Sequence, residues 1–310
     1  MAQSEGNGLS AECGLLVENV TKRYGEKTAV DGLSFRLNQP GVFGLLGTNG
    51  AGKTTTIRMI LGILEKDGGR ITWNGKPVAR ESVQFGYLPE ERGLYPQVKV
   101  MDQLCYFASL RGISGEKAKK SVNYWLGRLG AVKYADMPAE RLSKGNQQKI
   151  QLVTAILHNP DLIVMDEPTS GLDPINADLF KSVILELVEK GKYIVLSSHQ
   201  MEAVEEYCRD ILLLVDGKAV LSGNLREIKR SYGRTNLFLG CEADIMPMAS
   251  PLGITLVNRS AVGFELKIPS DESAYALLQK LLEQGVAFDK FEIREPTLHE
   301  IFVEKAGDKQ

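Results

Sequence analysis

The stretch LLGTNGAGKTTT, residues 45–56, decides the fold of this chain. It follows GVFGLLG (41–47), a nearly all-apolar segment of the kind that forms a strand buried on both faces. It then runs into residues 53–64, where apolar side chains recur at helical spacing. The glycines and lysine match G-x-x-x-x-G-K-[ST], which predicts a phosphate-binding loop between a strand and a helix. A glycine-rich turn without a ligand is the alternative, and the flanking strand and helix argue against it.

The residue types in this loop suit a nucleotide. Glycines let the backbone curl so that successive N–H groups point at phosphate oxygens, and the positive end of the following helix favours an anion. We expect the Lys53 amine to reach the β- and γ-phosphates and the Thr54 hydroxyl to bind Mg²⁺. The residues expected to hold the nucleotide here are Gly47, Thr48, Asn49, Gly50, Ala51, Gly52, Lys53, Thr54 and Thr55.

Acidic residues follow a second apolar strand, DLIVMDE (161–167). Ligands bind at the carboxyl ends of strands in open α/β sheets, which is where Asp166 and Glu167 lie. Asp166 suits metal binding, and Glu167 suits the general base that accepts a proton from water. The alternative is that the pair merely begins a loop. His199 follows YIVLSS (193–198) at another strand end and can donate a hydrogen bond toward a γ-phosphate.

The composition limits the class of protein. The chain has 310 residues, which is long for one typical domain and predicts two cores. Its 43% hydrophobic and 25% charged residues are typical of a globular protein, and a net charge of -2 gives no electrostatic reason to expect nucleic acid as a partner. Cys13, Cys105, Cys208 and Cys241 are far apart and form no CxxC, so neither a zinc site nor a disulfide framework is expected.

Neither export nor membrane insertion is expected from the sequence. The polar residues 1–14 lack the basic patch and apolar core of a signal peptide. Apolar runs such as DLIVMD and ILLLV fall far short of the roughly 20 residues that a membrane-spanning helix needs. We therefore expect this chain not to cross a bilayer alone.

Four further segments, together with the loop, carry a family resemblance: KRYG (22–25), LSKGNQQKIQL (142–152), SGLD (170–173) and SSHQM (197–201). Over about residues 14–230 their order and spacing resemble those of the ATP-binding cassette (ABC) ATPases. The resemblance implies an α/β P-loop NTPase fold over 14–231, with an antiparallel β subdomain and a helical subdomain at about 97–158. The cofactors that it implies are ATP and Mg²⁺.

The resemblance also assigns site residues outside the loop. In ABC dimers the LSKGN signature faces the γ-phosphate on the partner's loop, so Ser143, Gly145 and Asn146 would act on a partner's ATP, and Asp173 would cross the same interface. From the residues alone, Ser143 is the N-cap of a helix. Tyr24 would stack on adenine, although an aromatic residue at a strand end usually belongs to the core.

Two departures from the family pattern concern the metal and the signature. Glu90 stands in YLPEER where the family usually has glutamine, and a carboxylate binds a hard cation more strongly than an amide does, so we expect Glu90 at Mg²⁺. The signature has Lys144 for a glycine and Asn146 for a glutamine. In both departures the chain resembles one branch of the family, the ATP-binding subunits of bacterial sodium-efflux and ABC-2-type exporters.

Residues 100–130 alternate apolar and charged faces at helical spacing. In ABC proteins this region forms a groove for a cytoplasmic helix of the membrane subunit. Tyr95, Tyr106 and Phe107 are the candidates for that groove, although each is more often a core residue. The other two histidines, His158 and His299, lie on predicted helices and are expected at the surface or in packing.

The last part of the chain has a different character. After an Asp216-Gly217 hairpin turn, residues 234–310 read as β-α-β-β-α-β and a final helix, which predicts a small α+β ferredoxin-like domain, assigned to 232–310. It contains neither a phosphate loop nor a catalytic cluster. Two roles remain open for this domain: it could brace a dimer, or it could sense a ligand.

The expected function is that of the ATPase subunit of a bacterial ABC exporter, cytoplasmic and peripheral on the inner face of the membrane. Its partners would be a polytopic membrane permease and a second copy of itself or a homologous ATPase, with no nucleic acid. One rival is a soluble ABC ATPase that acts on ribosomes or nucleic acid, but such proteins usually carry two cassettes or a long insertion. The second rival is a binding or scaffold subunit that does not hydrolyse ATP, and the joint presence of Glu167 and His199 argues against it.

Overall fold

The computed structural model describes residues 14–78, 84–91 and 93–307. The predictions for residues 1–13, that for Cys13 included, lie outside the described residues. Between Ser222 and Gly223 the chain divides into two compact units. Helix α7 (Leu225–Tyr232) therefore lies in the C-terminal unit, whereas the sequence placed this segment at the end of the first domain.

The first sheet of the N-terminal unit is antiparallel, with the strand order β2-β1-β4-β5. Every buried side chain of β1 is apolar, because one face of this sheet packs on the core. A two-residue turn with Gly25 in the left-handed region joins β1 directly to β2. The strands are β1 (Leu15–Tyr24), β2 (Lys27–Leu37), β4 (Gly68–Trp73) and β5 (Lys76–Pro77).

The second sheet has six strands in the order β10-β9-β3-β8-β7-β6, and the five from β9 to β6 are parallel. Strand β7 is buried along its whole length, as its continuous apolar sequence predicts for a strand covered on both faces. The strands are β3 (Gly41–Gly47), β6 (Phe85–Leu88), β7 (Leu162–Asp166), β8 (Tyr193–Ser198), β9 (Asp210–Val215) and β10 (Lys218–Asn224).

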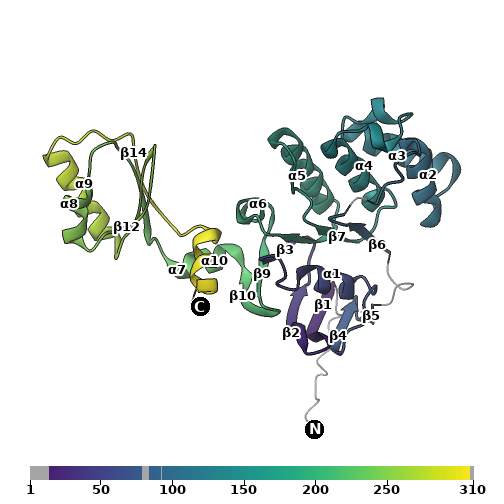
Figure 1. The fold of residues 1–310 in the computed structure, drawn as a ribbon, viewed down its shortest axis with the longest axis horizontal. Helices are drawn as coiled ribbons and strands as arrows, with labels where there is room; N and C mark the ends of the chain where they lie inside the picture. Colours follow the sequence, from purple (N-terminus) through teal and green to yellow (C-terminus); the bar gives the residue numbers. More distant parts are fainter. Residues whose placement is uncertain (1–13, 79–83, 92, 308–310) are drawn as a thin grey trace, which may run out of the picture. The chain divides into compact units, whose positions relative to one another are not determined.

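Helices cover both faces of this parallel sheet. Helix α1 (Lys53–Ile60) lies between the two sheets and contacts β2, β3 and β7 (Figure 1). Helices α5 (Pro174–Glu189) and α6 (Met201–Tyr207) lie on the opposite face, where α6 packs on β3 and β8. One buried apolar cluster joins both sheets and α1. The predicted P-loop NTPase fold with an antiparallel β subdomain is confirmed.

The predicted helical subdomain is also confirmed. Its helices α2 (Val100–Leu110), α3 (Gly115–Arg128) and α4 (Lys144–Ile156) pack against one another, and α4 also packs against β6. Short 3₁₀ turns at Val132–Tyr134 and Ala139–Arg141 connect α3 to α4.

The C-terminal unit has its own antiparallel sheet in the order β12-β13-β11-β14. Numbered along the chain these strands stand 4-1-3-2 from the β14 edge, which is the predicted ferredoxin-like arrangement. Two helices pack on one face of the sheet and close a separate apolar core (Figure 1). The elements are β11 (Asn236–Gly240), α8 (Met246–Ala249), β12 (Thr255–Ser260), β13 (Gly263–Lys267), α9 (Asp271–Glu283), β14 (Lys290–Arg294) and α10 (Leu298–Gly307).

Two sequence expectations concern membranes and cysteines. In the part of the chain that the structure describes, no helix combines the length and apolarity needed to cross a bilayer. Cys105, Cys208 and Cys241 are free thiols.

Candidate functional site

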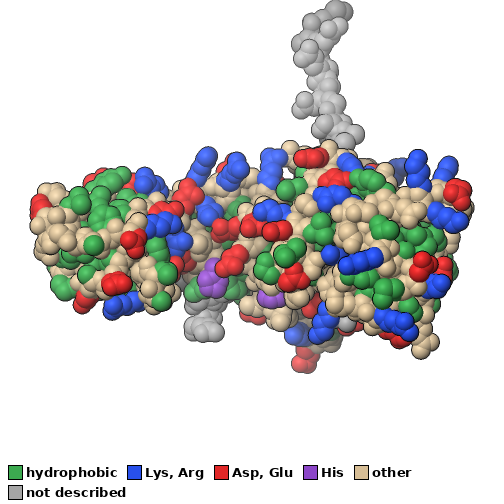
Figure 2. Space-filling model, turned by 90° about the horizontal axis from the view of Figure 1, so that it is seen from above, with side chains coloured by type: hydrophobic (Ala, Val, Ile, Leu, Met, Phe, Trp, Pro, Cys, Tyr) green, Lys and Arg blue, Asp and Glu red, His purple; other side chains and the backbone are tan. Residues whose placement is uncertain are grey.

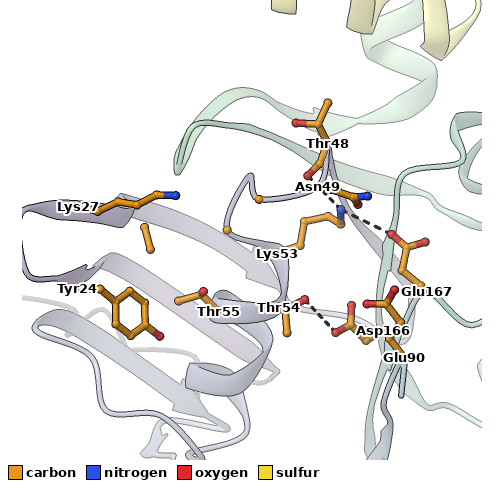
Figure 3. A pocket seen from close by; sticks show the side chains of 13 residues that line it. Tyr24, Lys27, Thr48, Asn49, Lys53, Thr54, Thr55, Glu90, Asp166 and Glu167 are labelled. Atoms are coloured by element: carbon orange, nitrogen blue, oxygen red, sulfur yellow. Dashed lines mark hydrogen bonds and ion pairs between the residues drawn. The ribbon is translucent and has the colours of Figure 1, made fainter. Parts of the chain in front are cut away.

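A cavity of about 440 Å³ opens beside the loop that joins β3 to α1. Loop residues 48–50 and 52–55 form its floor. Tyr24 and Lys27 line one end, and Glu90, Asp166 and Glu167 line the other (Figure 3). Elements far apart in the sequence thus converge on one cavity: the β1–β2 hairpin, the loop, and the ends of β6 and β7.

The loop glycines are needed for their backbone conformation and for close contact. Gly50 and Gly52 have positive φ angles of 84° and 104°. A Cβ atom on Gly52 would lie 2.6 Å from the carbonyl oxygen of Ala29, and one on Gly47 would lie 2.5 Å from that of Leu214. Side chains at these two positions would push the loop off the neighbouring strands.

Two residues of the predicted loop set do not line the cavity. Ala51 is buried in the apolar core, and Gly47 lies at the end of β3 against β9. Their place in the structure is to anchor and shape the loop. Thr48, Asn49, Gly50, Gly52, Lys53, Thr54 and Thr55 all line the cavity.

The Lys53 side chain is buried and folded into its own loop. Its amine donates hydrogen bonds to the carbonyl oxygens of Gly47 (2.8 Å) and Thr48 (3.3 Å). It also lies 3.6 Å from Oε1 of Glu167, so a cation and a carboxylate face each other across the cavity.

The two acidic residues at the end of β7 have different environments. Asp166 accepts hydrogen bonds from the hydroxyls of Thr54 (3.2 Å) and Ser197. Glu167 has a left-handed backbone with φ 50°, which is uncommon for a residue other than glycine. Its N–H donates to the Ser197 carbonyl oxygen at 3.1 Å, which holds it in this conformation.

His199 follows β8 and faces the same carboxylate. Its Nδ1 lies 2.9 Å from Oε1 of Glu167, while about half of its side chain is exposed. Lys53, Glu167 and His199 thus form a continuous chain of ionisable groups. Ser197, which holds both Asp166 and the Glu167 backbone, was missed in the sequence, where its only signal is a hydroxyl at the end of an otherwise apolar strand.

The residues at the acidic end fit a magnesium ion. The Thr54 hydroxyl and the carboxylates of Asp166 and Glu90 all line it, and hard oxygen ligands are what Mg²⁺ prefers. Gln151 on α4 donates to the carbonyl oxygens of Pro89 (3.2 Å) and Glu91 (2.7 Å), which fixes the chain on both sides of Glu90. Gln151 is a second supporting residue that the sequence did not reveal.

The signature residues lie elsewhere, where α4 and α5 begin. A Cβ atom on Gly145 would meet the Asn176 amide at 3.2 Å, and Asn176 donates its backbone N–H to Asp173 at 3.0 Å. Ser143 occupies the N-cap position of α4 without the expected capping bond, and its hydroxyl accepts a hydrogen bond from the Asn146 amide at 2.9 Å instead. The predicted residues at these two helix starts are therefore a group apart from the predicted residues that line the cavity.

The other two histidines, His158 and His299, lie outside the cavity. His158 lies just after α4 rather than on a helix, and its Nε2 is 3.0 Å from the carbonyl oxygen of Phe85. Burial lowers the pKa of His158 to about 4, so this ring is neutral near pH 7. His299 is exposed on α10.

Two family models match the chain. One, described as ABC transporter, covers residues 30–170, and one described as ATP-binding protein DrrA1-3-like, C-terminal domain, covers residues 223–306. The uncharacterized ABC transporter ATP-binding protein YhaQ of Bacillus subtilis (strain 168) is 47% identical over 94% of this chain and 98% of its own length. The Nod factor export ATP-binding protein I of Ralstonia nicotianae is 35% identical over 73% of this chain and 72% of its own.

A solved structure agrees with these sequence matches. The ATP binding subunit of an ABC transporter superposes with a TM-score of 0.66 at 30% identity, over 71% of this chain and 93% of that chain.

Proposed function

The chain belongs to the ABC transporter family of ATP-binding proteins, and from that membership we propose that it is the ATPase subunit of a bacterial exporter that drives a separate membrane-spanning subunit. Proteins of this family bind and hydrolyse ATP. The observation that carries the proposal is the convergence of Lys53, Asp166 and Glu167 on one cavity beside the glycine loop. A relative that is named for Nod factor export supports the direction of transport.

Each group at the cavity has a chemical task in hydrolysis. Lys53 exchanges its contacts with loop carbonyls for the β- and γ-phosphates, whose charge it neutralises. Glu167 accepts the proton of the attacking water, and His199, 2.9 Å from it, orients the carboxylate and faces the γ-phosphate. Thr54, Asp166 and Glu90 hold Mg²⁺, which when bound supplies further positive charge to the phosphate oxygens.

The adenine of ATP lies at the opposite end of the cavity from these carboxylates. Tyr24 is half exposed in the β1–β2 hairpin and lines the cavity, so its ring is free to stack on adenine.

Two copies are needed to complete the site. Ser143, Gly145, Asn146 and Asp173 do not line the cavity of their own chain. They lie at the starts of α4 and α5, and the N-terminus of a helix favours an anion. We assign them to the ATP bound by a second copy, so that ATP closes the dimer and hydrolysis reopens it.

Dimer closure can be tested on a chain that ends at Ser222, since a C-terminal contact would mask it. We expect the Glu167→Gln variant to dimerise with ATP in the absence of Mg²⁺ and to remain a monomer with ADP, measured by light scattering. The matched control, Glu167→Gln with Lys53→Ala, should stay monomeric with either nucleotide. A mass that does not change when ATP is added contradicts the closure mechanism.

An aromatic cluster in the helical subdomain suits the membrane partner. The rings of Tyr95 and Phe107 stack with centroids 5.8 Å apart, and Tyr106 lies 5.8 Å from Phe107. Tyr95 and Tyr106 are half exposed. Buried Gln103 accepts from the N–H of Tyr95 at 3.2 Å and donates to the carbonyl oxygen of Val98 at 3.0 Å, which fixes this loop on α2.

We assign the aromatic cluster to a cytoplasmic helix of the permease, which places the chain at the inner face of the membrane. Capture from native membranes should recover one polytopic protein with the wild-type chain and much less with Tyr106→Ala. Val132→Ala is the control, because Val132 is exposed in the same subdomain but outside the cluster. Equal recovery with Tyr106→Ala would remove the cluster from the docking surface.

A further inference from the structure

The nucleotide cavity contains a cation that no motif in the sequence assigned. Lys27, the first residue of β2, lines it together with Lys53. Lys53 is occupied by two loop carbonyls and by Glu167. Lys27 is exposed. Within residues 14–78, 84–91 and 93–307, it forms no ion pair with another side chain. A charged amine in a cavity without a protein partner is available to a ligand.

The hairpin fixes where this amine stands. Lys27 pairs directly with Tyr24 across the antiparallel β1–β2 ladder. Residues directly opposite each other in such a pair project from the same face of the sheet. Figure 3 shows both side chains at one end of the cavity, with the amine of Lys27 extending toward the loop. The contact between Ala29 and Gly52 holds β2 against that loop, so the distance between Lys27 and the loop is set by packed backbone.

The charges around the cavity are distributed unevenly. Its carboxylates, those of Glu90, Asp166 and Glu167, lie at the far end with Lys53 (Figure 3). At the Tyr24 end, Lys22 has its amine 5.8 Å from the Tyr24 ring centroid, but it is bound to Asp67 at 2.9 Å. Among the described residues that line this end, Lys27 is therefore the cation that remains for a ligand.

We propose that Lys27 binds the α-phosphate of the nucleotide. The inference rests on the proposed function, which places adenine at Tyr24 and the γ-phosphate at Lys53 and Glu167. A nucleotide that spans these two ends carries its α-phosphate past the loop on the side that Lys27 faces. Because ATP and ADP share the α-phosphate, Lys27 contributes equally to the binding of both and takes no part in hydrolysis.

Calorimetric titration of the full chain with ATP and with ADP, without Mg²⁺ and at low salt, tests the assignment. We expect Lys27→Gln to weaken the binding of both nucleotides by the same factor, roughly 5- to 30-fold, which is at the low end for the loss of a hydrogen bond to a charged group because the Lys27 amine is exposed. Lys27→Arg should restore most of the affinity because it restores the charge. High salt should shrink the difference, because the pair is exposed.

Lys76→Gln is the matched control, since Lys76 is exposed on β5 of the same sheet but outside the cavity. Unchanged thermal unfolding of Lys27→Gln would show that the fold is intact. Wild-type affinity of Lys27→Gln for both nucleotides overturns the proposal, and so does a loss that disappears with the 2′-deoxynucleotides, which would place the contact at the ribose. A wild-type chain that binds neither ATP nor ADP contradicts the proposed function itself.

Discussion

Glu167 stands in a conformation that its neighbours in space enforce. Its φ of 50° lies in a region that costs a residue other than glycine of order 1 kcal/mol. The N–H bond to Ser197 holds the backbone, and Lys53 and His199 face the carboxylate. This strained position aims the carboxylate at the loop, where a γ-phosphate would lie.

If Glu167 is the general base, Glu167→Gln should leave ATP bound but reduce turnover by about 10²- to 10⁴-fold, because an amide cannot accept the proton of water. Steady-state phosphate release and an equilibrium titration with ATP measure the two effects separately. Lys53→Ala should instead weaken ATP binding itself. Near-normal turnover by Glu167→Gln would remove Glu167 from this role.

A separate prediction concerns Glu90, whose carboxylate lines the acidic end of the cavity. Glu90→Gln should raise the Mg²⁺ concentration that gives half-maximal ATPase activity, because an amide is a weaker ligand for a hard cation. ATP affinity without metal should change little, since Gln151 holds the chain on both sides of the substitution. Glu91→Gln is the neighbouring control. An unaltered Mg²⁺ dependence would mean that Glu90 is not a ligand.

Helices α3 and α5 are joined by a cluster of charged and aromatic side chains centred on Glu186. This carboxylate accepts from Arg128 (2.8 Å) and Tyr124 (2.7 Å) on α3, and from Lys190 (2.6 Å). The ammonium of Lys190 also lies 5.2 Å from the ring centroid of Trp125. The cluster ties the helical subdomain, which carries the signature, to α5, whose N-cap is Asp173.

Glu186 makes this connection sensitive to acid. Burial alone would raise its pKa, but hydrogen bonds from Lys190, Tyr124 and Arg128 outweigh burial and lower the pKa to about 2. A carboxyl with a lowered folded-state pKa stabilises the fold above its unfolded value near 4.5, and this contribution is lost as the pH falls toward 2.

Glu186→Gln should therefore lower the free energy of unfolding by about 1–3 kcal/mol at pH 7 and by less at about pH 3.5. Urea unfolding at the two pH values measures the difference. Glu189→Gln, an exposed carboxylate at the end of the same helix, is the control. An equal deficit at both pH values would show that charge is not the reason.

Local patterns predicted most elements, and distant contacts explain the rest. The hairpin at Asp216-Gly217 forms as expected, with both residues in the left-handed region. Helix α1 ends at Ile60, although apolar spacing continues to Leu64, because Gly62 turns left-handed just beyond the helix. The parts played by Ser197, Gln151 and Lys27 follow from the meeting of segments far apart in the sequence, which no short window contains.

The chain as a whole consists of two compact units, each with an apolar cluster of its own. Every residue that lines the cavity belongs to the first unit. A chain that ends at Ser222 should therefore bind ATP with an affinity within a few-fold of the full chain. Titration of both forms with ATP checks this. Loss of binding on truncation would reject the division into independent units.

The C-terminal unit carries apolar side chains at its surface. Hydrophobic side chains reach its surface among charged ones (Figure 2). Tyr275 and Leu282 are more than half exposed on α9, seven residues apart and so on one side of the helix. Two-fold interfaces are self-complementary, so such a stripe can pair with its own copy.

We therefore expect residues 223–310, expressed alone, to form a dimer that Leu282→Glu dissociates, because the substitution places a charge in an apolar contact where it has no partner. Gln284→Glu is the control, since it adds the same charge at the exposed C-cap of α9, nine residues after Tyr275 and so on the other side of the helix. Sedimentation equilibrium measures the mass of each form. Equal dissociation by both substitutions would point to net charge rather than to the stripe. A wild-type fragment that stays monomeric at high concentration would reject the brace and leave ligand sensing as the task of this unit.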